Sequence, residues 1–161
     1  MSADFFLKID GIEGECTKRG HEKEIDIHSM SFGVSQPLQV GRGGAGLSAG
    51  KASFGEIHFT KFTDKASPKL FQAAGGGTHI PSVVFTSQKA AGDKPMLYYK
   101  VTLTDVMVSS FQNAGASGSE MTEQVSIGYS KIEFEYIEQG KTGGAGAKNM
   151  ASFNVVEGEA A

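Results

Sequence analysis

The chain of 161 residues is long enough for one domain with its own core, and its 22 glycines are about twice the usual share. Fifteen basic and eighteen acidic residues leave a net charge of −3, which argues against nucleic acid or an anionic membrane surface as partner. A single cysteine excludes an internal disulfide, and no apolar run approaches the ~18 residues of a membrane span.

Apolar and polar residues alternate along most of the chain, which is typical of half-buried strands. Phe5, Leu7 and Ile9 predict the first strand, and Ile25 and Ile27 predict the second. Further strands are predicted over 30–34, 53–62, 80–87, 97–108, 125–136 and 151–156. The glycine-rich segments 40–51, 75–78, 113–119 and 140–148 are predicted to be loops.

Three of the alternating segments, 25–34, 97–108 and 125–136, change parity part-way along. In the second of them the apolar set is odd-numbered up to Leu103 and even-numbered from Val106. Because side chains alternate with period two, such a change moves the apolar set to the opposite face and requires a bulge or a sharp bend. The pattern therefore predicts a strongly coiled sheet that closes into a barrel or a sandwich.

One short helix is predicted after the fourth alternating segment. Ser67 is expected to be the N-cap and Pro68 the first helical residue, where a missing N–H costs nothing. Residues 69–74 continue the helix and Gly75–Gly77 end it. A helix this short is stable only when it packs on the sheet.

The sequence contains only weak matches to nucleotide-binding and metal-binding motifs. Gly41–Gly46 satisfies the dinucleotide pattern G-x-G-x-x-G but lacks a buried strand before it and a helix after it. The histidines are not at metal-ligand spacing, and Cys16 lies alone in a predicted surface loop. The four histidines are His21, His28, His58 and His79.

Catalytic arrangements are weak as well. The chain has no G-x-S-x-G elbow for a nucleophilic serine. Glu133 and Glu135 fall on one face of a strand, which predicts a solvated surface rather than a catalytic pair. We expect no metal, no cofactor, no catalytic residue and no enzymatic activity.

Several strands are apolar on both faces and so need cover on both sides. Phe6 lies opposite the face of Phe5, and Val84 lies between Val83 and Phe85. One short helix cannot supply this cover. Either a second sheet or neighbouring subunits could do so, and the pattern leaves both alternatives open.

The segment Ala3–Glu15 resembles the start of the haemolysin-coregulated protein (Hcp) family, the tube component of bacterial type VI secretion. Segments 20–27 and 31–36 resemble the stretches that follow it. Further similar segments are 54–57, 61–62, 64–70, 125–127 and 131–134. The resemblance covers almost the whole chain, in order, as a single domain over 1–161.

The resemblance implies a mainly β fold, a compact β-barrel or sandwich of two sheets with one short α-helix packed on its side. It implies hexameric rings that stack into a tube, which sheath contraction expels and which can carry effector proteins in its lumen. The implied partners are other copies, the spike protein, the contractile sheath, the baseplate and lumen effectors. The N-terminus, Met1–Lys8, has no signal-peptide pattern, as expected of a cytoplasmic protein that type VI secretion exports to the extracellular space or a target cell.

The resemblance also places two sets of site residues. A lumen wall should hold varied cargo without sticking to it, so small polar residues are expected there. Ser29, Ser31, Gly33 and Ser35 form such a row, and Ser31 falls on the lumen-facing wall as the expected cargo contact. The segment 36–51 resembles an extended loop that projects toward the adjacent ring and is expected to be mobile in an isolated ring. Its expected stacking residues are Leu38, Val40, Arg42 and Leu47.

Two other functions are alternatives to a tube subunit. A monomeric β-barrel that binds a small ligand in its interior would have the same strand pattern. A hydrolase with scattered catalytic residues lacks any supporting motif. The mass of the particle in solution separates the first of these from a tube subunit.

Overall fold

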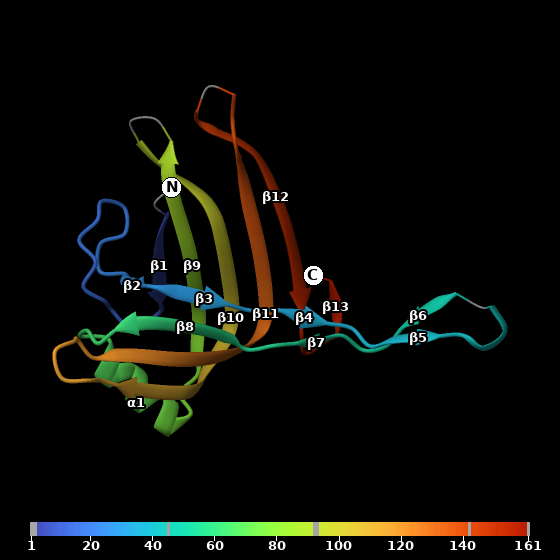
Figure 1. The fold of residues 1–161 in the computed structure, drawn as a ribbon, viewed down its shortest axis with the longest axis horizontal. Coiled ribbons are helices and arrows are strands. Elements are labelled where there is room, and N and C mark those ends of the chain that lie inside the picture. Colours follow the sequence, from blue (N-terminus) through green and yellow to red (C-terminus); the bar gives the residue numbers. More distant parts are fainter. Residues whose placement is uncertain (1–2, 45, 92–93, 142, 161) are drawn as a thin grey trace.

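The computed structural model describes residues 3–44, 46–91, 94–141 and 143–160. Within these ranges the chain is mainly β-structure, with one α-helix and one 3-10 turn, η1 (Arg42–Gly44) (Figure 1). The elements are β1 (Ala3–Ile9), β2 (Ile25–Ile27), β3 (Ser29–Ser31), β4 (Val34–Ser35), β5 (Leu38–Val40), β6 (Leu47–Ala49), β7 (Ser53–Phe54), β8 (Ile57–Phe62), α1 (Ser67–Gly76), β9 (Ile80–Ala91), β10 (Lys94–Ala114), β11 (Thr122–Gln139), β12 (Ala145–Asn154) and β13 (Glu159–Ala160).

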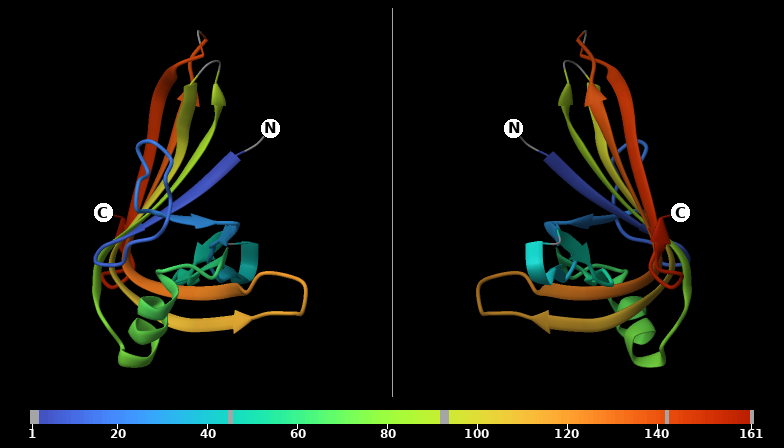
Figure 2. Two further views of the ribbon diagram at one scale, coloured as in Figure 1. Left: turned by 90° about the vertical axis from the view of Figure 1, so that its left-hand side faces the viewer. Right: turned by 90° about the vertical axis from the view of Figure 1, so that its right-hand side faces the viewer.

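A large antiparallel sheet forms one layer, with the strand order β13-β12-β11-β10-β9-β1-β2. β10 and β11 run on beyond this layer and turn into a second one (Figure 2). There β11 pairs with β8 through 122–127, and β8 pairs with β3. The second layer therefore has the order β3-β8-β11-β10, and two long strands belong to both layers.

The bend in these long strands occurs where the parity of the sequence changes, as predicted. Asp105 has φ of 54° and falls between the pairs Thr104↔Lys131 and Val106↔Tyr129. Ser130 Oγ donates to Asp105 Oδ2 at 2.8 Å, and this bond lowers the pKa of the Asp105 carboxyl. The aspartate tolerates the left-handed backbone region better than a β-branched residue would.

The core lies between the two layers and is filled by apolar side chains from both. Phe59 of the second layer meets Phe85 of the first edge-on, with ring centroids 5.7 Å apart. α1 packs on β10 and buries Leu70 and Ala73 against the same core. Helix and core thus agree with the fold expected from the sequence.

The start of α1 differs from the prediction. Ser67 is the first helical residue, and the N-cap is Ala66, whose side chain makes no capping bond. The helix ends at a glycine, as predicted, because Gly77 is its C-cap with φ of 62°. Gly75 and Gly76, however, still belong to the helix.

Ser67 is not the N-cap because its hydroxyl belongs to a buried ionic network. Lys61 Nζ lies 2.8 Å from both Asp64 Oδ1 and Glu123 Oε1. Ser67 Oγ donates to Glu123 Oε1 at 2.8 Å, and Asn113 Nδ2 donates to Glu123 Oε2 at 3.3 Å. The network joins the start of α1 to β8, β10 and β11, so it fixes the helix on the second layer.

Three other expectations need correction. Part of the predicted loop 140–148 belongs to β12, and the predicted loop 40–51 contains a paired hairpin, β5 with β6. Glu135 is buried rather than solvated, and it pairs with Lys148 at 3.0 Å. A buried carboxylate needs such a partner, and Lys148 lies on the adjacent strand β12.

The second apolar face of β1 is covered by the chain itself. Phe6 stacks on His21 with ring centroids 4.1 Å apart. The imidazole is held on both sides, by Glu24 at 2.7 Å and by Gln88 at 2.5 Å. The loop 10–24 therefore closes over this part of the large sheet, which the sequence pattern had left to either a sheet or a subunit.

Candidate functional site

The outer surface of the second layer is a regular polar face. We define the polar face by two rows of paired residues that run across β3, β8, β11 and β10. One row is Ser29, Thr60, Gln124 and Gln112, and the other is Ser31, His58, Ser126 and Ser110. The side chains between them in sequence, such as Ile57 and Phe59, point into the core. Alternation along each strand thus separates a polar surface from an apolar interior.

Hydrogen bonds across the strands hold this face together. Ser29 Oγ and Thr60 Oγ1 share a hydrogen bond of 2.5 Å. His58 Nδ1 and Ser126 Oγ lie 2.6 Å apart. The two rows contain no lysine, arginine or carboxylate, and five of their eight residues are serine or threonine. Such a surface offers many weak polar contacts and few strong ones.

Of the predicted lumen residues, Ser29 and Ser31 lie on the polar face in β3. Gly33 and Ser35 are exposed but lie beyond β3, where β4 pairs with β7. The partners of these serines on β8, β10 and β11 were not predicted from the sequence. The alternation of residues 57–60 and 124–127 indicates a polar face on these strands, but its polar residues were not assigned a role.

A long two-stranded arm leaves the second layer beside the polar face (Figure 1). We define the arm as residues 33–55, with a root of β4 and β7 and a tip of β5 and β6. At the tip Leu38, Val40 and Leu47 are 63%, 79% and 69% exposed. Three aliphatic side chains on one small hairpin have no cover within the described chain. Arg42, the fourth predicted stacking residue, has its side chain outside the described part of the structure.

The arm is attached firmly at its root. Tyr129 Oη donates to Gly55 O at 2.9 Å, and burial raises the pKa of this tyrosine. Phe54 packs on Phe153 of β12 with ring centroids 4.4 Å apart. These contacts tie the root to both layers, so the direction of the arm is set by the body of the protein.

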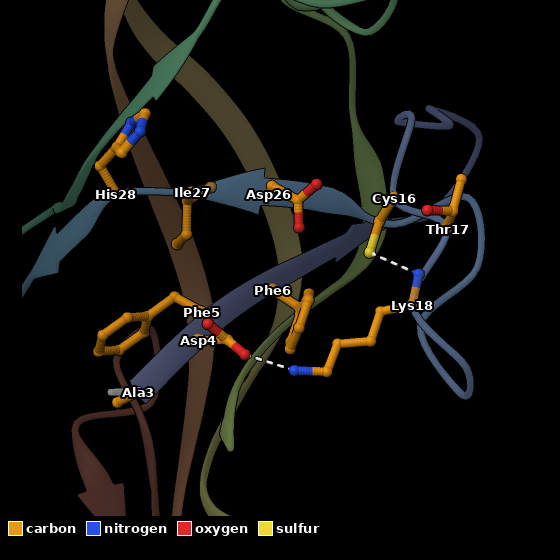
Figure 3. A pocket seen from close by; sticks show the side chains of 10 residues that line it. All are labelled: Ala3, Asp4, Phe5, Phe6, Cys16, Thr17, Lys18, Asp26, Ile27 and His28. Carbon is orange, nitrogen blue, oxygen red and sulfur yellow. Dashed lines mark hydrogen bonds and ion pairs between the residues drawn. The ribbon is translucent and has the colours of Figure 1, made fainter. Parts of the chain in front are cut away.

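A cleft of about 500 Å³ lies between β1, β2 and the loop 10–24 (Figure 3). It contains the ion pair Lys18–Asp4 and the thiol of Cys16, which accepts from Lys18 N at 3.5 Å. Cys16 is buried, against the expected surface position, and burial raises the pKa of its thiol. A raised pKa keeps the thiol protonated and weakly nucleophilic at neutral pH. The thiol of Cys16 is therefore not an activated nucleophile.

The described residues give no sign of a metal centre or a membrane-crossing helix. Within them no cluster of three or more His, Cys, Asp or Glu side chains could hold an ion. α1 spans ten residues, too few to cross a bilayer, and no other helix of the described ranges is long and apolar enough.

Solved structures with a similar fold include a type VI secretion protein and Hcp proteins. A solved structure of a type six secretion system protein has a TM-score of 0.93 and 30% identity, covering 99% of this chain and all of the other. Hcp1 of Salmonella typhimurium has a TM-score of 0.84 and 31% identity, and both chains are covered completely.

Sequence comparison points the same way. Residues 6–136 match the family described as "Type VI secretion system effector, Hcp". The protein Hcp1 of Pseudomonas aeruginosa is 35% identical over 140 residues, which covers 86% of each protein. The chain belongs to the Hcp family, and its role is that of a tube subunit in type VI secretion.

Proposed function

We propose that the polar face is the inner wall of a hexameric ring and that the arm joins one ring to the next. The observation that carries this proposal is the second layer itself, a sheet with a polar outer face and an apolar inner face. Family membership supports assembly into a tube that is secreted. The proposed role is mechanical and includes no catalytic step.

The edges of the second layer support ring closure. Within the described residues β3 pairs only with β8, and β9 accompanies β10 only as far as Val106. The layer thus ends in two different free strand edges, one on β3 and one on the distal part of β10. Free edges are unfavourable in solution, and joining unlike edges head-to-tail generates a closed ring.

The arm supports stacking of rings. Its exposed aliphatic tip would lose contact with water on reaching a neighbouring copy, which would stabilise the contact by about 1.5–3 kcal/mol for each fully buried side chain.

We further propose that the expelled tube carries effector proteins against the polar face and that it works with a spike, a contractile sheath and a baseplate. The interior of the chain is filled with side chains, which gives no support to a monomeric ligand-binding barrel.

The test of the proposal is the mass of the particle and its cargo. Size-exclusion chromatography with light scattering should give about six times the 17.0 kDa of one chain, and electron micrographs should show rings. Ser31→Arg should keep the ring and change the amount of cargo that copurifies, because a long cation replaces a small hydroxyl on the wall. A particle of one chain at high concentration would contradict the ring. Equal copurification by both forms would contradict the assignment of Ser31.

A further inference from the structure

A shallow groove of about 490 Å³ lies where the polar face meets the root of the arm. It is formed entirely within one chain, by β3, the start of β8 and the two strands of the root. Six of its lining residues matter here: Ser31, Gly33, Ser35, Ser53, Glu56 and His58. Three of them belong to the predicted lumen row, so the row and the groove overlap.

Two glycines make the groove hollow. Gly55 N donates to Gly33 O at 2.9 Å, which closes the backbone of the root without any side chain. A Cβ added at Gly33 would meet no atom within 4 Å. The position could therefore carry a side chain, and a larger residue there would fill the groove without straining the fold.

One carboxylate in the groove is held in place. Ser109 Oγ lies 2.7 Å from Glu56 Oε2, to which it donates, and 3.1 Å from Ser126 O. Ser109 has no register partner, because the ladder of β10 and β11 shifts between Val108 and Ser110. β-bulges commonly re-aim a side chain beside a binding site. Here the bulge supplies the hydroxyl that orients Glu56.

The groove contains an acidic side chain and neither lysine nor arginine. Neither its lining residues nor the two rows of the polar face include a lysine or an arginine. Glu56 is the carboxylate among them, and the hydroxyl of Ser109 donates to it. A cationic group that enters the groove meets an oriented carboxylate without competition from a lysine or an arginine.

We propose that this groove docks an extended segment of a cargo protein through an arginine or lysine side chain, and that Glu56 determines this preference. The inference rests on the proposed function, because the groove opens beside the face proposed to be the inner wall. Glu56 receives the cation, the hydroxyls of Ser31 and Ser53 provide polar contacts, and the glycines leave room for the backbone of the segment.

The test uses fluorescein-labelled glycine-serine peptides that carry either arginines or glutamates at the same positions. Fluorescence anisotropy with the full-length protein should show binding of the arginine peptide and weaker binding of the glutamate peptide. Glu56→Gln should weaken the arginine peptide about tenfold, the effect of one charge-assisted hydrogen bond. Glu56→Lys should reverse the preference. Asp10→Asn, an exposed site at the end of β1 with the same change in charge, should have no effect.

Gly33→Val provides a second variant, which should lower binding by filling the groove while the melting temperature stays unchanged. Equal binding of both peptides, or insensitivity to Glu56→Gln, would overturn the inference. Loss of tube growth in Glu56→Gln with unchanged peptide binding would assign the groove to a neighbouring copy and overturn it too.

Light scattering on the same samples separates this result from the fate of the ring. Rings that bind both peptides equally would refute the proposed docking in the groove and leave the proposed function intact. Single chains refute the ring, and because the groove is complete in one chain the same titration still decides the inference.

Discussion

Lys61 is a fully buried charge, and its side-chain partners are supplied by segments outside its own strand. Its ammonium group meets Asp64, Glu123, the Ser67 hydroxyl and the carbonyl of Phe62. In the sequence, Lys61 and Asp64 stood out only within family-like segments, Ser67 was also the expected N-cap, and Glu123 was not assigned a role. Nothing in their spacing predicted burial, because Glu123 lies far along the chain and reaches Lys61 only through the pairing of β8 with β11.

Lys61→Met should destabilise the protein by about 3–5 kcal/mol, because Glu123 is left as a buried carboxylate without its cation. Urea unfolding at neutral pH measures the change. Lys65→Met is the matched control, since Lys65 is exposed and lies 3.8 Å from Glu13; its loss should cost at most about 1 kcal/mol. Equal effects of the two variants would show that the buried network contributes no more than a surface pair.

Tyr99 predicts an alkaline loss of stability. Burial raises the pKa of Tyr99 to about 12, above the ordinary value of about 10 for an unfolded chain. The folded state therefore disfavours tyrosinate, so its contribution is complete below pH ~10 and is lost as the pH rises toward ~12. Tyr99→Phe should flatten the fall of unfolding free energy across this window. An unchanged slope in denaturant titrations would contradict the assignment.

At the scale of elements, the alternation pattern predicted the bends of β10 and β11, whereas only the family resemblance predicted a projecting segment at the arm. A parity change is visible in residues 97–108, because each half of the strand buries its own apolar set. The hairpin of β5 and β6 buries almost nothing, so its residues show no burial pattern to read. Its glycines predicted a loop, whereas cross-strand pairs such as Val40↔Leu47 make it a ribbon.

Gly50 is the residue on which the shape of the arm depends. Gly50 N donates to Pro37 O at 2.9 Å, and a Cβ at Gly50 would lie 2.7 Å from Pro37 Cγ. Gly50→Ala should therefore displace the tip and slow tube growth, followed by light scattering, while the melting temperature stays unchanged because the core is remote. Gly46→Ala, where a Cβ meets nothing within 4 Å, should grow tubes normally. Normal growth of both variants would show that the direction of the tip is unimportant.

At the scale of the whole molecule, the polar face could be predicted only in part. Ser29 and Ser31 were identified from the row 29–35, but the face is completed by strands distant in sequence. Pairing of β3 with β8 and of β8 with β11 decides which polar residues share one surface. The orientation of Glu56 in the groove depends on a bulge in β10, which no local pattern in residues 107–112 predicted.

Ring formation should depend on the edges of the second layer, and ring stacking should depend on the arm. Deleting Gly41–Gly46 should preserve the mass of the ring and weaken stacking, because the tip is remote from the edges of the second layer. Leu47→Ser should weaken stacking part-way, and Ser48→Ala in the same strand should not. Electron micrographs of tube lengths give the measurement. Unchanged tubes after the deletion would contradict the role of the arm, and loss of the ring would contradict the division.

Because β10 and β11 each run through both layers, the two halves of the molecule share covalent backbone as well as a core. Neither layer can melt and leave its neighbour intact, since the strands that would have to unzip are the framework of the surviving half. The subunit should therefore unfold as a single cooperative unit, which suits a protein that forms the wall of a tube.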